Sequence, residues 1–137
     1  MRWSQLLFSQ GFGTRRVCAG LIASQFVSVS GQAIDDDTEV DAIDGLAFEV
    51  NGQPWQYHAS ALILLHKPAG YECSHEPKHH RTVYSLLPHQ LVERNVQSVG
   101  RLNLNTTNLL LFSDDGAFIH NLSSPKKHIP KVYRAEL

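Results

Sequence analysis

The stretch Gly100-Arg101-Leu102-Asn103-Leu104-Asn105-Thr106-Thr107-Asn108-Leu109-Leu110-Leu111-Phe112 joins a polar segment directly to a continuous apolar run. The four apolar residues at its end predict a strand buried in a sheet, and the polar residues before them predict a loop. This loop and strand are the unit around which the remaining elements can be placed.

A second apolar run, residues 61–65, predicts another buried strand. It stops at His66-Lys67-Pro68-Ala69-Gly70-Tyr71, where Pro68 and Gly70 predict a rigid turn. The polar, histidine-rich residues 73–82 predict a loop. After the strand predicted at residues 109–112, Ser113-Asp114-Asp115-Gly116 predicts the start of a short helix with an aspartate near its N-cap. Pro125 is expected to end that helix, and residues 132–137 to begin a further strand.

The first sixty residues predict two helices followed by strands. Trp3, Leu6 and Leu7 recur at helical spacing, and Gly11 and Gly13 break the pattern. Thr14 is a suitable N-cap for a second helix over residues 15–24. Its expected apolar face consists of Val17, Leu21 and Ile22.

Alternating residues then predict strands. Val27 and Val29 alternate with serines before Gly31, and the run Leu46, Phe48 and Val50 precedes an Asn51-Gly52 turn. Residues 53–60 contain a proline and lack a clear period, which predicts a linker, although Trp55 and Tyr57 are candidates for packing.

The composition is that of a globular protein, with 137 residues, 42% hydrophobic, 18% charged and a net charge of −1. No apolar run approaches the roughly 20 residues that a membrane-spanning helix requires. Polar residues and glycine follow Met1 too soon for a signal peptide. Two cysteines, Cys18 and Cys73, cannot build a disulfide framework, so a cytoplasmic location is expected.

Charge is distributed unevenly along the chain. Residues 1–60 carry three arginines against seven acidic side chains, a net charge of −4. Residues 61–137 carry nine lysines and arginines against six acidic side chains, a net charge of +3, and seven of the eight histidines. The second part therefore favours an anionic partner, although an ordinary solvated surface explains the same charges.

Several short motifs resemble those of one family. Residues 13–16 (Gly-Thr-Arg-Arg) and 27–31 (Val-Ser-Val-Ser-Gly) resemble the Gly-x-Ser-Arg and Val-x-Val-(Asn/Asp)-Gly motifs of an S4 RNA-binding domain. Residues 65–71 (Leu-His-Lys-Pro-Ala-Gly-Tyr) resemble the Asn-Lys-Pro-x-Gly-(Tyr/Val) turn of the RsuA-like ribosomal RNA pseudouridine synthases. Residues 100–109 resemble the catalytic loop of that family, Gly-Arg-Leu-Asp-x-(Asp/Asn)-(Thr/Ser)-x-Gly-Leu. Residues 131–133 resemble its Lys-x-Tyr motif.

The resemblance places Asn103 where the family has its catalytic aspartate. That carboxylate is implicated in attack on the uridine or in proton chemistry at the sugar. A neutral amide is a poor nucleophile and cannot take the proton, so the chain as written is expected to be inactive. Asn108 stands where the family has glycine, a position that asparagine tolerates if the backbone needs a positive φ. An engineered knockout usually replaces the catalytic residue alone. Replacements at both positions 103 and 108 therefore favour a paralogue whose sequence has drifted.

Other site residues follow from the same resemblance. Arg101 matches the arginine that helps hold the flipped-out nucleotide, and Tyr133 matches the tyrosine that stacks on the target base. Lys67 matches the lysine of the first motif, which is structural or faces a phosphate. The expected catalytic set consists of Asn103, Arg101 and Tyr133. The expected RNA-binding residues are Arg2, Arg15, Arg16, Lys67, Lys126, Lys127 and Lys131.

Each of these residues also has a simpler interpretation. Asparagines are common turn formers, a strand tyrosine usually packs in a core, and exposed arginines are usually solvated. Cys73-Ser74-His75 with His79-His80 superficially resembles a metal site. It lacks paired Cys-x₂-Cys spacing, so no metal is expected, and the resemblance implies no cofactor.

The resemblance implies an α+β fold: an S4-like RNA-binding domain at residues 1–58, a linker at 59–60, and part of a mostly antiparallel pseudouridine synthase domain at 61–137. Because the chain stops within a predicted strand, a fragment of a longer protein is expected. The expected function is isomerisation of uridine in ribosomal RNA, preferably of the small subunit, by a chain that is truncated and inactive. The alternative is a non-catalytic RNA-binding protein. The expected partner is ribosomal RNA, with no membrane, no small-molecule cofactor and a monomeric state.

Overall fold

The computed structural model describes residues 1–123 and divides the chain into two compact units. Among the described residues, the first unit combines Met1–Ala61 with Ser85–Asn95, and the second contains Leu62–Tyr84 and residues 96–123. Several predictions lie outside the described residues: the helix end at Pro125, the strand at residues 132–137, and the site residues Lys126, Lys127, Lys131 and Tyr133.

Two short helices open the first unit. Helix α1, Trp3–Ser9, buries Trp3, Leu6 and Leu7, as their spacing predicted. Helix α2, Arg15–Ala23, begins after Thr14, whose hydroxyl accepts a hydrogen bond from the backbone N–H of Val17 at 3.1 Å. The predicted apolar face of α2 was partly wrong: Val17 is 49% exposed, and the buried residues are Cys18 and Ile22.

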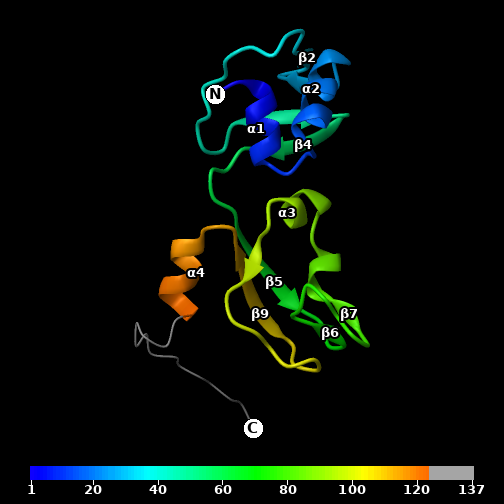
Figure 1. The fold of residues 1–137 in the computed structure, drawn as a ribbon, viewed down its shortest axis with the longest axis vertical. Helices are drawn as coiled ribbons and strands as arrows, with labels where there is room; N and C mark the ends of the chain where they lie inside the picture. Colours follow the sequence, from blue (N-terminus) through cyan, green and yellow to red (C-terminus); the bar gives the residue numbers. More distant parts are fainter. Residues whose placement is uncertain (124–137) are drawn as a thin grey trace. The chain divides into compact units, whose positions relative to one another are not determined.

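These helices lie beside a four-stranded antiparallel sheet (Figure 1). Its strand order is β2 (Gln32–Ala33), β1 (Val27–Val29), β3 (Ala47–Val50) and β4 (Gln53–Gln56). Asn51 and Gly52 both have positive φ in the turn between β3 and β4, as an Asn-Gly hairpin requires. The predicted linker at residues 53–60 is wrong in its first half, because Gln53–Gln56 pairs with β3 along its whole length.

Aromatic side chains form much of the core of the first unit. Phe48 contacts Trp3 with ring centroids 5.8 Å apart and Phe12 at 6.0 Å, and Phe12 contacts Trp55 at 5.5 Å. Tyr57 is also buried, so the two aromatic residues suggested for packing in this segment do pack. The segment contributed from later in the chain carries helix α3, His89–Glu93, which no sequence pattern had predicted.

The second unit is built on strands β5 (Leu62–Lys67), β9 (Asn108–Ser113) and β8 (Gln97–Ser98), all paired antiparallel. Figure 1 shows β5 and β9 running side by side. The strands β6 (Tyr71–Glu72) and β7 (Arg81–Thr82) form a short parallel pair at the ends of the predicted loop. A 3₁₀ turn at Val83–Leu86 follows β7.

The two apolar runs form strands as predicted, but they are not buried on both faces. Leu62 and Leu64 on β5 are 63% and 59% exposed, and Leu109 on β9 is also exposed. Leu110 and Phe112 on the opposite face of β9 are buried, as are Val83, Tyr84 and Val96. Each strand therefore has one face toward solvent and one more deeply covered.

Helix α4, Gly116–Ser123, follows β9. The predicted aspartate cap is Asp115, whose Oδ1 accepts hydrogen bonds from the backbone N–H groups of Ala117 at 3.1 Å and Phe118 at 3.2 Å. None of the helices in residues 1–123 has the length and apolar character needed to cross a membrane.

Candidate functional site

The loop between β8 and β9, residues 99–107, is held in place by the buried side chain of Lys67, and we call it the anchored loop. The Lys67 ammonium donates hydrogen bonds to the carbonyl oxygens of Leu104 at 2.7 Å, Thr106 at 3.0 Å and Pro68 at 3.0 Å. An ammonium has three donors, and all three are used here. Lys67 is 0% exposed, so it has no surface to offer an RNA phosphate. This placement favours the structural role for Lys67 over the predicted RNA contact.

The turn after β5 adds a second contact to the same loop carbonyl. The backbone N–H of Gly70, which has a φ of +87°, donates to the carbonyl of Leu104 at 2.9 Å. Within the loop, the N–H of Thr106 donates to the carbonyl of Asn103 at 3.0 Å. The turn and the loop, two of the motifs singled out from the sequence, therefore meet at Leu104.

Asn103 and Arg101 both lie exposed on this anchored loop. Arg101 borders a hollow of about 220 Å³ whose other lining residues include Cys73, His75, Tyr84 and Gln97. Between the two site residues, the backbone N–H of Leu102 donates to Sγ of Cys73 at 3.5 Å. The guanidinium of Arg101 and the amide of Asn103 are therefore exposed to solvent on a loop whose backbone is held by hydrogen bonds from Lys67 and Gly70.

Tyr84 supports the wall of this hollow and was not singled out from the sequence. Its hydroxyl accepts a hydrogen bond from the N–H of Ser98 at 3.0 Å, and its ring stacks on His75 with centroids 3.8 Å apart. The Tyr84 ring also contacts Phe112 at 5.5 Å. No local pattern in the sequence marks this residue, because its partners come from three separate segments.

Asn108 does not need the left-handed backbone that the resemblance suggested. It is the first residue of β9, it pairs with Lys67, and its φ is not positive. Its side-chain Oδ1 accepts a hydrogen bond from the N–H of Leu109 at 2.8 Å. Asparagine at this position therefore carries no left-handed strain in this structure.

The three predicted RNA-binding arginines of the first unit are all exposed. The guanidinium carbon of Arg15 lies 4.8 Å from the centroid of the Phe8 ring. The backbone N–H of Arg2 donates to Oε1 of Gln5 at 2.8 Å, and Arg2 also forms a β-bridge with Glu39. Glu39, one of the seven acidic residues of the first sixty, therefore lies directly against the N-terminus of the chain.

Arg94 is a second structural cation, and no pattern in the sequence indicates its role. Its guanidinium donates to Oε1 of the buried Gln10 at 3.1 Å and to the carbonyls of His58 at 3.0 Å and Ala59 at 3.3 Å. The Gln10 side chain itself bonds to the backbone N–H and carbonyl of His58. This network ties Ser85–Asn95 to the rest of the first unit.

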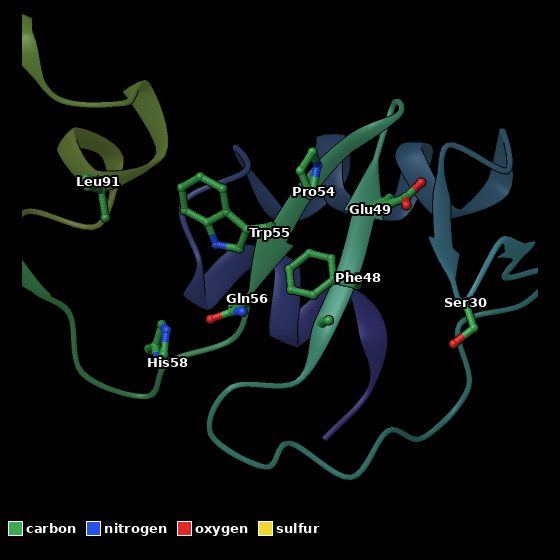
Figure 2. Close-up of a pocket in the computed structure, with 9 residues that line it drawn as sticks. Ser30, Phe48, Glu49, Pro54, Trp55, Gln56, His58 and Leu91 are labelled. Atoms are coloured by element: carbon green, nitrogen blue, oxygen red, sulfur yellow. The ribbon is translucent and has the colours of Figure 1, made fainter.

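A larger hollow of about 660 Å³ lies over strands β3 and β4 (Figure 2). Figure 2 shows Phe48, Glu49, Trp55 and Gln56 along these strands, with Leu91 contributed by α3. Among the described residues that line it there is no lysine or arginine, and Glu49 is acidic. Its chemistry therefore does not suit an RNA phosphate, and it contains no predicted site residue.

The thiol of Cys18 lies in the core of the first unit. Burial raises the pKa of this thiol above its ordinary value of 9.0. Within residues 1–123, no three histidine, cysteine, aspartate or glutamate side chains come together as ligands for a metal ion.

The sequence is similar to proteins of one known family. The profile of the RNA pseudouridylate synthase family matches residues 61–137. The chain is 31% identical over 137 residues to the uncharacterized RNA pseudouridine synthase YtzG of Bacillus subtilis, covering 100% of this chain and 57% of that protein. It is 33% identical over 138 residues to ribosomal small subunit pseudouridine synthase A of Pasteurella multocida, covering 100% and 59%.

A further relative is ribosomal large subunit pseudouridine synthase B of Vibrio cholerae, 35% identical over 136 residues that cover 94% of this chain and 41% of that protein. A crystal structure described as a pseudouridylate synthase aligns with a TM-score of 0.45 and 24% identity, covering 93% of this chain and 54% of the other. The chain thus spans between two fifths and three fifths of the length of these relatives.

Proposed function

The chain belongs to the RNA pseudouridylate synthase family, and from that membership we propose that it derives from an isomerase that converts uridine to pseudouridine in ribosomal RNA. We further propose that this polypeptide does not itself isomerise uridine, because Asn103 takes the place of the catalytic carboxylate. Relatives that match the whole chain include small-subunit enzymes, which favours small-subunit ribosomal RNA as the substrate.

The observation that carries this proposal is the position of Asn103 on a loop built to present a side chain. The loop accepts two hydrogen bonds from the Lys67 ammonium and one from the backbone N–H of Gly70, while Asn103 is exposed. An aspartate at the same position would present a carboxylate to a nucleotide without moving the backbone. The proposed loss of the catalytic group is supported by the chemistry of residue 103: the loop that would hold a carboxylate is present, but its side chain at this position is an amide.

An amide cannot replace a carboxylate in either chemical role. It is a much weaker nucleophile, and it cannot accept a proton as a general base near neutral pH. Arg101, two residues away and exposed, remains available to contact an RNA backbone or an extruded nucleotide. The chain therefore keeps RNA-contacting groups and lacks the reactive one.

A non-catalytic RNA-binding protein is the second candidate function. The exposed arginines of the first unit and the S4-like motifs at residues 13–16 and 27–31 favour it. The net charge of −4 over residues 1–60 weakens binding that depends on phosphate contacts. The two candidates differ in whether a single carboxylate restores chemistry.

The test is an Asn103→Asp variant, with Asn105→Asp as the matched control. Both substitutions add one negative charge to the same loop, but only residue 103 corresponds to the catalytic position. Each variant is made in the full-length gene product and mixed with small-subunit ribosomal RNA carrying tritium at carbon 5 of uridine. We expect Asn103→Asp to release tritium, and the native protein and Asn105→Asp to release none.

Tritium release by the native protein would contradict the proposed inactivity. If neither variant releases tritium while both still bind the RNA, the non-catalytic function is favoured. Equal release by the two variants would show that added charge, rather than the position of the carboxylate, is responsible.

A further inference from the structure

A hollow on the first unit brings an exposed aromatic ring together with an arginine. It has a volume of about 260 Å³ and is lined by Ser4, Gln5 and Phe8 of α1 and by Arg15, the first residue of α2. Because Ser4 and Phe8 are four residues apart on a helix, they lie on the same face.

Phe8 is 44% exposed and takes no part in the aromatic core of this unit. The Arg15 guanidinium lies over its ring at 4.8 Å, which is within the range of a cation–π contact. Such a contact keeps the guanidinium close to the ring face. The pair presents two flat groups, an aromatic ring and a guanidinium plane, beside the hollow.

Polar groups border this pair. Oε1 of Gln5 accepts a hydrogen bond from the backbone N–H of Arg2, and the Gln5 side chain also carries an NH₂ group that can donate. The Ser4 hydroxyl donates to Asp37 at 2.6 Å, and the Ser4 backbone N–H donates to the same carboxylate at 2.8 Å. A carboxylate beside the hollow repels phosphate but does not disfavour a neutral base.

We propose that Ser4, Gln5, Phe8 and Arg15 form a binding site for one unpaired RNA nucleotide, whose base stacks against the Phe8–Arg15 pair. The inference rests on the proposed function in RNA. Base stacking needs no net positive charge, whereas backbone binding does. The net charge of −4 over residues 1–60 therefore favours recognition of the base over recognition of the phosphates. Unpaired bases are the usual targets of stacking side chains in RNA.

The first experiment compares Phe8→Leu with the matched control Phe26→Leu in the 137-residue chain. Phe26 is 49% exposed and belongs to the same unit, but it does not line the hollow. Binding is measured by fluorescence anisotropy with labelled oligoadenylate of about 12 nucleotides, a length within the range of single-strand sites. We expect Phe8→Leu to weaken binding at least about five-fold, and Phe26→Leu to leave it unchanged.

The second experiment separates stacking from charge. Arg15→Lys keeps the positive charge but removes the planar group, and Arg81→Lys makes the same change at an exposed arginine outside the expected RNA-binding set. We expect Arg15→Lys to weaken oligoadenylate binding without changing its salt dependence, because the number of charges is the same. Arg81→Lys should retain the native affinity. Far-UV circular dichroism confirms that each variant is folded.

Three outcomes would overturn the site. In the first, Phe8→Leu and Arg15→Lys bind oligoadenylate as the native chain does. In the second, a paired RNA duplex of the same length binds the native chain as tightly as the single strand. In the third, the native chain binds neither oligoadenylate nor ribosomal RNA, which would also refute the RNA-binding part of the proposed function. The tritium-release test of Asn103→Asp judges the catalytic part independently.

Discussion

The ammonium of Lys67 lies 2.7 Å from the carbonyl oxygen of Leu104, although 37 residues separate them in the chain. This contact joins the end of β5 to the loop that carries Arg101 and Asn103. Because Lys67 also donates to the carbonyl of Thr106 in the same loop, one buried side chain holds the loop backbone at two points, and its third hydrogen bond goes to Pro68 in the turn. The position of the candidate site thus depends on a residue that cannot itself touch RNA.

Replacing Lys67 with methionine should loosen the loop. Lys67→Met keeps most of the side-chain volume but removes three donors, and three carbonyls lose their charged partner. We expect a loss of about 2 kcal/mol in the free energy of unfolding and faster amide exchange at residues 102–108. Urea unfolding and hydrogen–deuterium exchange measure these effects. Lys78→Met, at an exposed position, is the control and should change neither quantity.

Gly11 is predicted to be intolerant of a side chain for two reasons. Its φ is +84°, and a Cβ there would lie 2.0 Å from the carbonyl oxygen of Gln90. Gly52 has a φ of +78°, but a Cβ at this position would meet no other atom within 4 Å, so Gly52→Ala tests backbone strain alone. We expect Gly52→Ala to cost about 1–2 kcal/mol and Gly11→Ala to cost clearly more, as measured by thermal unfolding. Equal losses would show that the contact with Gln90 is not maintained in solution.

Arg94 should stabilise the first unit through its bonds to Gln10, His58 and Ala59. Arg94→Met keeps an apolar stem but leaves these acceptors without the guanidinium. We expect a loss of about 2 kcal/mol by denaturant unfolding, against no loss for Arg81→Met at an exposed position. A double-mutant cycle with Gln10→Leu should give a coupling energy of at least about 0.5 kcal/mol, and additive effects would contradict the network.

The raised pKa of Cys18 predicts a loss of stability at alkaline pH. Burial favours the neutral thiol, so the folded state holds its proton above pH 9.0, where the unfolded state releases it. This contribution is fully present below pH 9.0 and decreases as the pH rises through and beyond that value. Urea unfolding between about pH 8 and 10 should show a decline that Cys18→Ala reduces, with a slope of at most about 1.4 kcal/mol per pH unit. Identical slopes for the native chain and Cys18→Ala would refute it.

Where the sequence carries a local signal, prediction and structure agree. The spacing of Trp3, Leu6 and Leu7 predicted α1, the Thr14 hydroxyl marked the start of α2, and Asn51-Gly52 marked the turn of a hairpin. Each of these signals acts within about one turn of chain, so neighbouring residues are sufficient to specify it.

Prediction failed where pairing partners are distant. Strand β4 was missed because Pro54 and the lack of alternation argue against a strand, yet proline is tolerated on an edge strand such as this one. Leu62 and Leu64 were expected to be buried because they belong to a continuous apolar run, but they are exposed. Such a run does not show whether both faces of the strand are covered or only one.

The amino-acid sequence alone was enough to specify α1, α2, the turn at Asn51-Gly52 and the amide at residue 103. The folded structure was needed to show that Lys67 is buried and bonded to the loop carbonyls, that Arg15 lies over Phe8, and that Ser85–Asn95 joins the first unit. The physical reason is that helices, caps and tight turns are specified by interactions between near neighbours. Contacts between distant segments form only when the whole chain closes around a shared core, and the sequence pattern does not record which closure has the lowest free energy.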